Sequence, residues 1–133
     1  ALGDNSSAVG SNAVASDIGA TANGAGAQAL SAYTIALGSK AVASDLHAIA
    51  EGFNSTASNV GSTALGGFSQ SNGRLSSALG YSAVASSVDS TAVGVAAQAS
   101  GASAVAIGEI SKATGEESVA VGGSAFSGWI PTQ

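Results

Sequence analysis

Apolar and small residues alternate with a period of two along most of this chain. Segments such as Ser-Ala-Val-Ala-Ile at 103–107 and Glu-Ser-Val-Ala-Val at 117–121 each end in two aliphatic residues with Ala between them. Because successive side chains of a strand point to opposite faces, this pattern predicts β-strands, whereas a helix would show a period of 3.6. A shorter segment of the same kind follows each one, as at 83–85, so we expect two strands per unit.

A glycine ends each first segment and recurs every fourteen residues without a slip. Glycine permits a positive φ at a turn, and Asp, Asn, Ser or Gly occupies the other turn of each unit. Fourteen residues leave no room for a crossover helix as well. The sequence therefore predicts an all-β fold, a β-solenoid of nine 14-residue coils whose equivalent positions stack about 4.8 Å apart. The repeat glycines are Gly10, Gly24, Gly38, Gly52, Gly66, Gly80, Gly94, Gly108 and Gly122.

Four columns of each coil hold only small residues. The positions four and two before the repeat glycine, and three and five after it, are Ala, Ser or Thr. We expect these columns to point into the coil, between two sheets that pack closer than the usual distance of about 10 Å.

The aliphatic residues one and three positions before the repeat glycine must then face outwards. A continuous apolar stripe of this kind is rare on soluble monomers and marks an association surface. We therefore expect an oligomer of closed rotational symmetry, with a core shared between chains. The predicted shared-core residues are Val9, Ile35, Leu37, Ile49, Leu65, Leu79, Val93, Val105, Ile107, Val119 and Val121. The polar exceptions in the column one before the glycine are Asn23 and Glu51, and the column three before it also contains Ser and Thr.

Composition excludes several classes of function. Of 133 residues, 30 are Ala, 24 Ser and 19 Gly, and only 8% are charged. A net charge of −5 with three cations excludes a basic nucleic-acid surface. The absence of Cys excludes a disulfide framework, and no apolar run approaches the roughly 18 residues of a membrane span. If the protein is exported, we expect its signal to lie outside this sequence.

The units Ser-Ala-Val-Ala-Ile-Gly at 103–108 and Glu-Ser-Val-Ala-Val-Gly at 117–122 resemble the YadA-like head repeats of trimeric autotransporter adhesins. The resemblance covers residues 1–127, and 128–133 form the end of the roll or the start of a following domain. It implies a left-handed parallel β-roll and a homotrimer around one axis. It also implies display on the surface of a Gram-negative bacterium, with an outer-membrane anchor elsewhere in the parent chain. Members attach to host extracellular matrix or cell-surface molecules.

Three aromatic residues fall on one edge of neighbouring coils. Phe53 and Tyr81 directly follow their repeat glycines, and Phe68 lies two after the glycine of the coil between. We predict that they form an aromatic ledge that contacts a protein or glycan ligand. The alternative, which the sequence favours, is that the rings cover the sheet edge or pack on an adjacent chain.

Glu51 occupies a shared-core column between Leu37 and Leu65. Several copies near one axis would repel and lose hydration unless each carboxylate finds a partner, for which His47 or a cation is a candidate. The alternative is that Glu51 turns aside and pairs with a polar group of a neighbouring chain. Asn23 is a milder exception that is suited to holding water or fixing register.

The sequence contains no pattern typical of an enzyme, a cofactor site or a metal site. His47 is the single His, so neither a multi-histidine site nor a triad is indicated. The favoured function is a multivalent adhesin head, and the alternative is a stiff spacer that projects another binding domain. An ice-binding solenoid is disfavoured because the outward column four after the glycine mixes Val, Gln, Thr, Lys and Phe. A β-helical lyase lacks clustered acids and bases.

Overall fold

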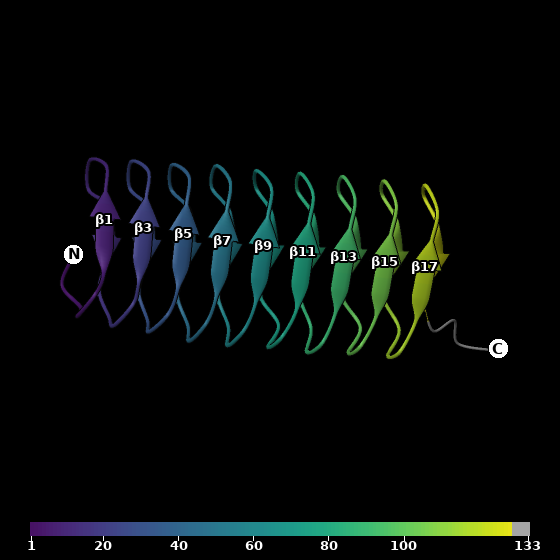
Figure 1. The fold of residues 1–133 in the computed structure, drawn as a ribbon. Coiled ribbons are helices and arrows are strands. Elements are labelled where there is room, and N and C mark those ends of the chain that lie inside the picture. Colours follow the sequence, from purple (N-terminus) through teal and green to yellow (C-terminus); the bar gives the residue numbers. More distant parts are fainter. Residues whose placement is uncertain (129–133) are drawn as a thin grey trace.

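A computed structural model of the chain describes residues 1–128, and these form one continuous β-solenoid (Figure 1). Each coil contains a three-residue strand and a two-residue strand. The three-residue strands are β1 (Ser7–Val9), β3 (Thr21–Asn23), β5 (Ile35–Leu37), β7 (Ile49–Glu51), β9 (Thr63–Leu65), β11 (Ser77–Leu79), β13 (Thr91–Val93), β15 (Val105–Ile107) and β17 (Val119–Val121). The two-residue strands are β2 (Val14–Ala15), β4 (Gln28–Ala29), β6 (Val42–Ala43), β8 (Thr56–Ala57), β10 (Gln70–Ser71), β12 (Val84–Ala85), β14 (Gln98–Ala99), β16 (Lys112–Ala113) and β18 (Phe126–Ser127).

The strands form two parallel sheets, one from the odd-numbered strands and one from the even-numbered strands. Every strand pairs with its equivalent in the next coil, so that Ala8 pairs with Ala22 and Gln28 with Val42. The fourteen-residue period of the sequence is therefore the register of both ladders. The prediction of a parallel β-solenoid with two strands per coil is confirmed for residues 1–128.

The strands are shorter than the alternating segments of the sequence. The segment 103–107 was expected to be one strand, but only Val105–Ile107 is extended, because Ser103 has a φ of 56° and belongs to the turn. At the other end of each first strand the repeat glycine has a φ between 121° and 138°, as at Gly38 and Gly24. Two turns therefore leave room for only three residues of strand on this side of the coil.

Small side chains fill the space between the two sheets. The Ala residues of the four predicted inner columns are fully buried along the body of the roll, as Ala36, Ala43 and Ala92 show. The largest side chains that are fully buried are Thr34 and seven serines, so among the described residues no Leu, Ile, Val or aromatic side chain lies in the core of a single chain. Two of the inner hydroxyls show how a local partner is found: Thr34 Oγ1 donates to the Ser31 carbonyl at 2.6 Å and Ser90 Oγ to the Ser87 carbonyl at 2.7 Å. The prediction that the small-residue columns point into the coil is confirmed.

The two turns of each coil define two long edges of the roll. The glycine turn follows the arrow tips of the odd-numbered strands in Figure 1, and the second turn precedes those strands on the opposite edge. Each turn contains one residue with a φ between 55° and 69°, in addition to the repeat glycine of the glycine turn. In three of these positions it is Gly, namely Gly19, Gly26 and Gly61, but elsewhere it is a residue with a side chain.

Candidate functional site

The three aromatic residues of the glycine-turn edge contact one another. The ring centroids of Phe53 and Phe68 lie 5.4 Å apart with an interplanar angle of 76°, and those of Phe68 and Tyr81 lie 5.6 Å apart at 75°. Both are edge-to-face arrangements, which the quadrupoles of the rings favour. Phe53 and Tyr81 are half exposed, at 50% and 56%. The structure therefore brings together the residues predicted to form an aromatic ledge, and their binding of a ligand stays a prediction.

Gly67 makes room for this cluster. It occupies the place in the middle coil that Phe53 and Tyr81 occupy in the coils on either side. A Cβ atom on Gly67 would lie 3.4 Å and 3.5 Å from two ring atoms of Tyr81, so the Tyr81 ring leans over the missing side chain. Because the aromatic residue of the middle coil stands one position later, at Phe68, the three rings can interleave rather than overlap.

The predicted shared-core residues lie on the outer face of the odd-strand sheet. Ile35, Leu37, Ile49, Leu65, Leu79, Val93 and Val105 are half-buried, and Val9, Ile107, Val119 and Val121 are exposed. In the ladder Leu37 pairs with Glu51 and Glu51 with Leu65, so the carboxylate interrupts this column, as Asn23 does between Val9 and Leu37. Asn23 and Glu51 are both exposed in the single chain.

His47, which was a candidate partner for Glu51 at the end of β7, lies on the second-turn edge and packs against Tyr33. The two rings are stacked, with centroids 5.4 Å apart and an interplanar angle of 12°. Both residues are in the left-handed region, with φ of 56° for Tyr33 and 60° for His47. Sequence reasoning missed this stack, although the spacing of fourteen residues between Tyr33 and His47 could have indicated it.

Sequence reasoning also missed that the second-turn edge is apolar. Polar turn residues were expected there, and Asp17 and Asp45 do accept hydrogen bonds from the following backbone N–H groups at 2.7 Å. However, each of the six second turns from 17–19 to 87–89 also carries one large apolar side chain, and five of these six side chains are exposed. These residues are Ile18, Tyr33, Leu46, Leu75 and Val88, together with the half-buried Val60.

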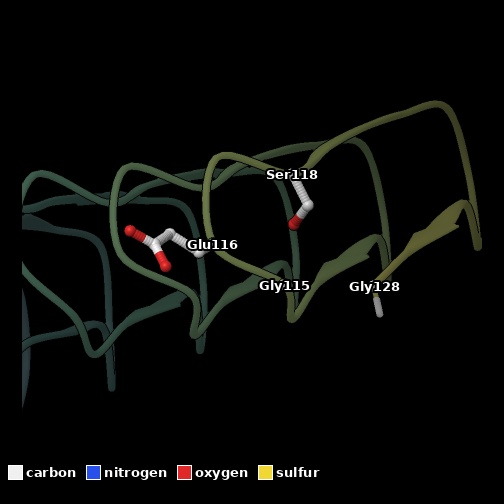
Figure 2. Close-up of a pocket in the computed structure, with 4 residues that line it drawn as sticks. All are labelled: Gly115, Glu116, Ser118 and Gly128. Carbon is white, nitrogen blue, oxygen red and sulfur yellow. The ribbon is translucent and has the colours of Figure 1, made fainter. Parts of the chain in front are cut away.

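A cavity of about 490 Å³ lies at the C-terminal end of the described roll, lined by Gly115, Glu116, Ser118 and Gly128 (Figure 2). The Ser118 Oγ is buried without a hydrogen-bond partner among the described residues. Figure 2 shows that the Glu116 carboxylate points away from Ser118, so the two polar groups do not converge on one point. This arrangement offers no pair of groups for catalysis.

Within residues 1–128 no group of three or more His, Asp or Glu side chains is placed to hold a metal ion. The same part of the chain has no helix that is long and apolar enough to cross a membrane. The segment 128–133, predicted to be the end of the roll or the start of a following domain, lies outside the described residues apart from Gly128.

Comparison with protein families identifies the fourteen-residue repeat. The YadA head domain repeat matches residues 1–27, 29–55, 47–69, 57–83, 71–97, 85–108 and 99–125. The chain belongs to the YadA head family. Successive matches overlap and together span nearly all of the roll, so the family assignment rests on the same fourteen-residue unit that forms the coils.

YadA heads belong to trimeric autotransporter adhesins, and the resemblance found in the sequence is thereby confirmed. Membership of this family marks the chain as an adhesin-type domain from a surface-exposed passenger. The comparison with curated proteins found no match.

Proposed function

We propose that this YadA head is the binding head of a homotrimeric adhesin on the outer membrane of a Gram-negative bacterium. In this proposal three left-handed rolls surround one axis and attach to a protein or glycan of the host matrix or cell surface. The membrane anchor lies elsewhere in the parent chain. The role is non-catalytic and needs no cofactor.

The observation that carries the proposal is the apolar outer face of the odd-strand sheet. It extends from Val9, which is 57% exposed, to Val121, which is 65% exposed, with interruptions at Asn23 and Glu51, and no helix or loop within residues 1–128 covers it. An apolar stripe along the whole length of a protein this poor in charge supports burial against other copies. Cyclic symmetry with the axis parallel to the roll would bring the stripes of all chains together.

Adhesion through repeated weak contacts fits the rest of the surface. The outer column of the even-strand sheet carries exposed Gln28, Gln70, Gln98 and Lys112, which offer hydrogen bonds and no deep cleft. Three such surfaces around one axis, on many fibres, would raise the effective affinity by 10²–10⁴ or so even if each contact is weak.

Binding of the isolated chain to host material tests the proposal. The chain is added to wells coated with solubilised basement-membrane matrix and to cultured epithelial cells, and bound protein is quantified. The matched control is the double variant Leu65→Asp, Leu79→Asp, which places charges on the apolar face and is expected to dissociate the trimer. We expect the parent chain to bind both surfaces and the control to lose most of its avidity. No binding by a chain shown to be trimeric would refute the adhesive role.

A stiff spacer is the second candidate function. The observation in its favour is the uniform register, because every strand from β1 to β18 pairs with its equivalent in an adjacent coil without a bulge. A rod of this kind holds whatever lies beyond it at a fixed distance. The spacer predicts a trimer that binds neither the matrix coat nor the cells.

The predicted ligand contact at the aromatic cluster has its own test. Replacing Phe53, Phe68 and Tyr81 by Ala should reduce matrix or cell binding if these rings face the ligand. The proposal of an adhesin head does not depend on this outcome, because the even-strand sheet offers another exposed surface.

A further inference from the structure

Both edges of the roll carry large apolar side chains that the single chain leaves exposed. On the glycine-turn edge these are Phe53, Phe68, Tyr81, Val95 and Ile110, exposed by 38% to 56%. On the second-turn edge the exposed residues are Ile18, Tyr33, Leu46, Leu75 and Val88, with a range of 38% to 52%. The apolar outer face of the odd-strand sheet lies between the two edges, so the three surfaces form one apolar band around that side of the roll.

Several of these side chains occupy backbone conformations that disfavour them. Phe68, Leu75 and Ile110 have φ values of 60°, 57° and 58°. Non-glycine residues are uncommon in this region, and a β-branched residue such as Ile is an outlier there. Asn or Gly would form these turns with less strain, as Asn12 and Gly61 do at equivalent positions. Large apolar residues at strained and exposed turns indicate a contact outside the chain that compensates for the strain.

The order of the chain sets the heights of the two edges. Each glycine turn lies between two second turns, so Phe68 lies between Val60 and Leu75 along the roll, about half of a 4.8 Å coil from each. Phe53 lies in the same way between Leu46 and Val60. Rotation about an axis parallel to the roll leaves every height unchanged. In a ring of chains, the glycine-turn edge of one chain can therefore meet the second-turn edge of its neighbour, with the large apolar residues of the two edges about half a coil apart along the axis.

We infer that the glycine-turn edge of one chain packs against the second-turn edge of the next chain around the ring. The aromatic cluster Phe53, Phe68 and Tyr81 then covers Leu46, Val60, Leu75 and Val88 of its neighbour. This inference rests on the proposed trimer and deepens it, because it assigns the surfaces by which adjacent chains meet.

Three features favour a second copy over a host ligand as the occupant. A closed ring needs two different surfaces on each chain, and the two edges provide them. A ligand bound at the aromatic cluster would leave the apolar second-turn edge without a partner. Charge is also complementary between the two edges. Lys40 of the glycine-turn edge lies between Tyr33 and Asp45 along the roll axis. Asp45 of a neighbouring chain would therefore be within reach of the Lys40 ammonium group. The even-strand sheet remains open to a ligand.

Cysteine pairing between co-expressed variants tests the inference in the full chain, which has no cysteine of its own. Ala96→Cys lies on the glycine-turn edge and Ala102→Cys on the second-turn edge half a coil away. The control pair is Ala96→Cys with Ala32→Cys, which occupies the same column as Ala102 but five coils lower. Because a disulfide needs Cα atoms within about 7 Å, we expect a mixed disulfide dimer from the first pair only.

The single-cysteine variants expressed alone distinguish the possible arrangements. Equivalent residues of a ring meet one another only on its axis, so neither edge variant should form a dimer alone. A trimeric mass without the 96–102 disulfide, or a dimer from one variant alone, would overturn the inference and leave the proposed function standing. A single-chain mass for the parent protein would overturn both.

Phe68→Asn and Leu75→Asn provide a second measurement. Asn tolerates the left-handed region, so each variant relieves strain in its own turn while it removes an apolar contact. We expect unchanged or greater stability of the coil and a weakening of chain association by about tenfold or more, measured by sedimentation over a concentration series. Unchanged association, or loss of matrix binding with association intact, would contradict the inference and assign the rings to a ligand.

Discussion

The repeat glycines near the C-terminal end allow backbone strain and coil stacking to be measured separately. Gly108 has a φ of 125°, and a Cβ atom there would lie 2.5 Å from the carbonyl oxygen of Gly122 in the next coil. Gly122 has nearly the same φ, 126°, but its nearest neighbour would be the Ala125 Cβ at 3.9 Å. A Cβ atom on Gly123 would have no atom of another described residue outside its immediate neighbours within 4 Å, and the backbone there is not in the glycine-favouring region. The three Gly→Ala variants thus combine strain and clash, strain alone, and neither.

The expected losses of unfolding free energy follow from these contacts. Placing Ala at a φ suited to glycine costs about 1–3 kcal/mol, which applies to Gly108→Ala and Gly122→Ala. At Gly108 the methyl group also forces two coils apart, and overpacking of this kind adds about 1–3 kcal/mol. Gly123→Ala avoids both penalties and restricts the unfolded chain, so it should be neutral or stabilising by up to about 1 kcal/mol. The predicted order of stability is therefore Gly123→Ala, then Gly122→Ala, then Gly108→Ala.

Urea unfolding followed by far-UV circular dichroism measures this order. All variants must be compared at one protein concentration, because association contributes to the apparent stability of an oligomer. Equal losses for Gly108→Ala and Gly122→Ala would refute the argument that the glycine column is required by backbone contact between coils. Equal stability of Gly122→Ala and Gly123→Ala would refute the argument from φ.

Three further predictions concern the core and the apolar face. Ala92→Leu inserts a large side chain between the two sheets and should cost about 1–3 kcal/mol or more by thermal unfolding. The control Gln98→Leu, on the exposed outer face of the even-strand sheet, should be nearly neutral, and equal effects of the two variants would contradict a narrow core. Ser71 Oγ and Ser76 Oγ lie 2.6 Å apart in the core and share a hydrogen bond. A double-mutant cycle that replaces each by Ala should give a coupling free energy of about 0.5–1.5 kcal/mol, and a coupling of zero would count against this hydrogen bond. Glu51→Leu places an apolar side chain between Leu37 and Leu65. It should strengthen chain association, measured by sedimentation, by about 1–2 kcal/mol per chain. Weaker association would show that the carboxylate has a favourable partner.

The fold could be predicted from the sequence because its period is also its register. A residue such as Ala36 recurs with the same neighbours every fourteen positions, so one coil determines the others. The inner columns were equally clear, since only Ala, Ser and Thr occur where the sheets are closest.

The turns were harder to predict because their residues do not follow ordinary turn preferences. Tyr33, Phe68, Leu75 and Ile110 take left-handed backbone conformations that composition alone would assign to Gly, Asn or Asp. For the same reason, the apolar character of the second-turn edge and the stack of Tyr33 on His47 were not anticipated. The adjacency of Phe53, Phe68 and Tyr81 could be predicted, because it follows directly from the stacking of coils.

Sedimentation equilibrium of the purified chain is the most direct test of the proposed trimer. The chain mass is 12.4 kDa, and a stable homotrimer is expected to sediment as a single species of three times this mass that persists as the protein is diluted. Its odd-strand apolar face would then be buried between chains. A folded, β-rich species with the mass of one chain would contradict the account, because it would show that the apolar face and both edges are stable in water without a partner.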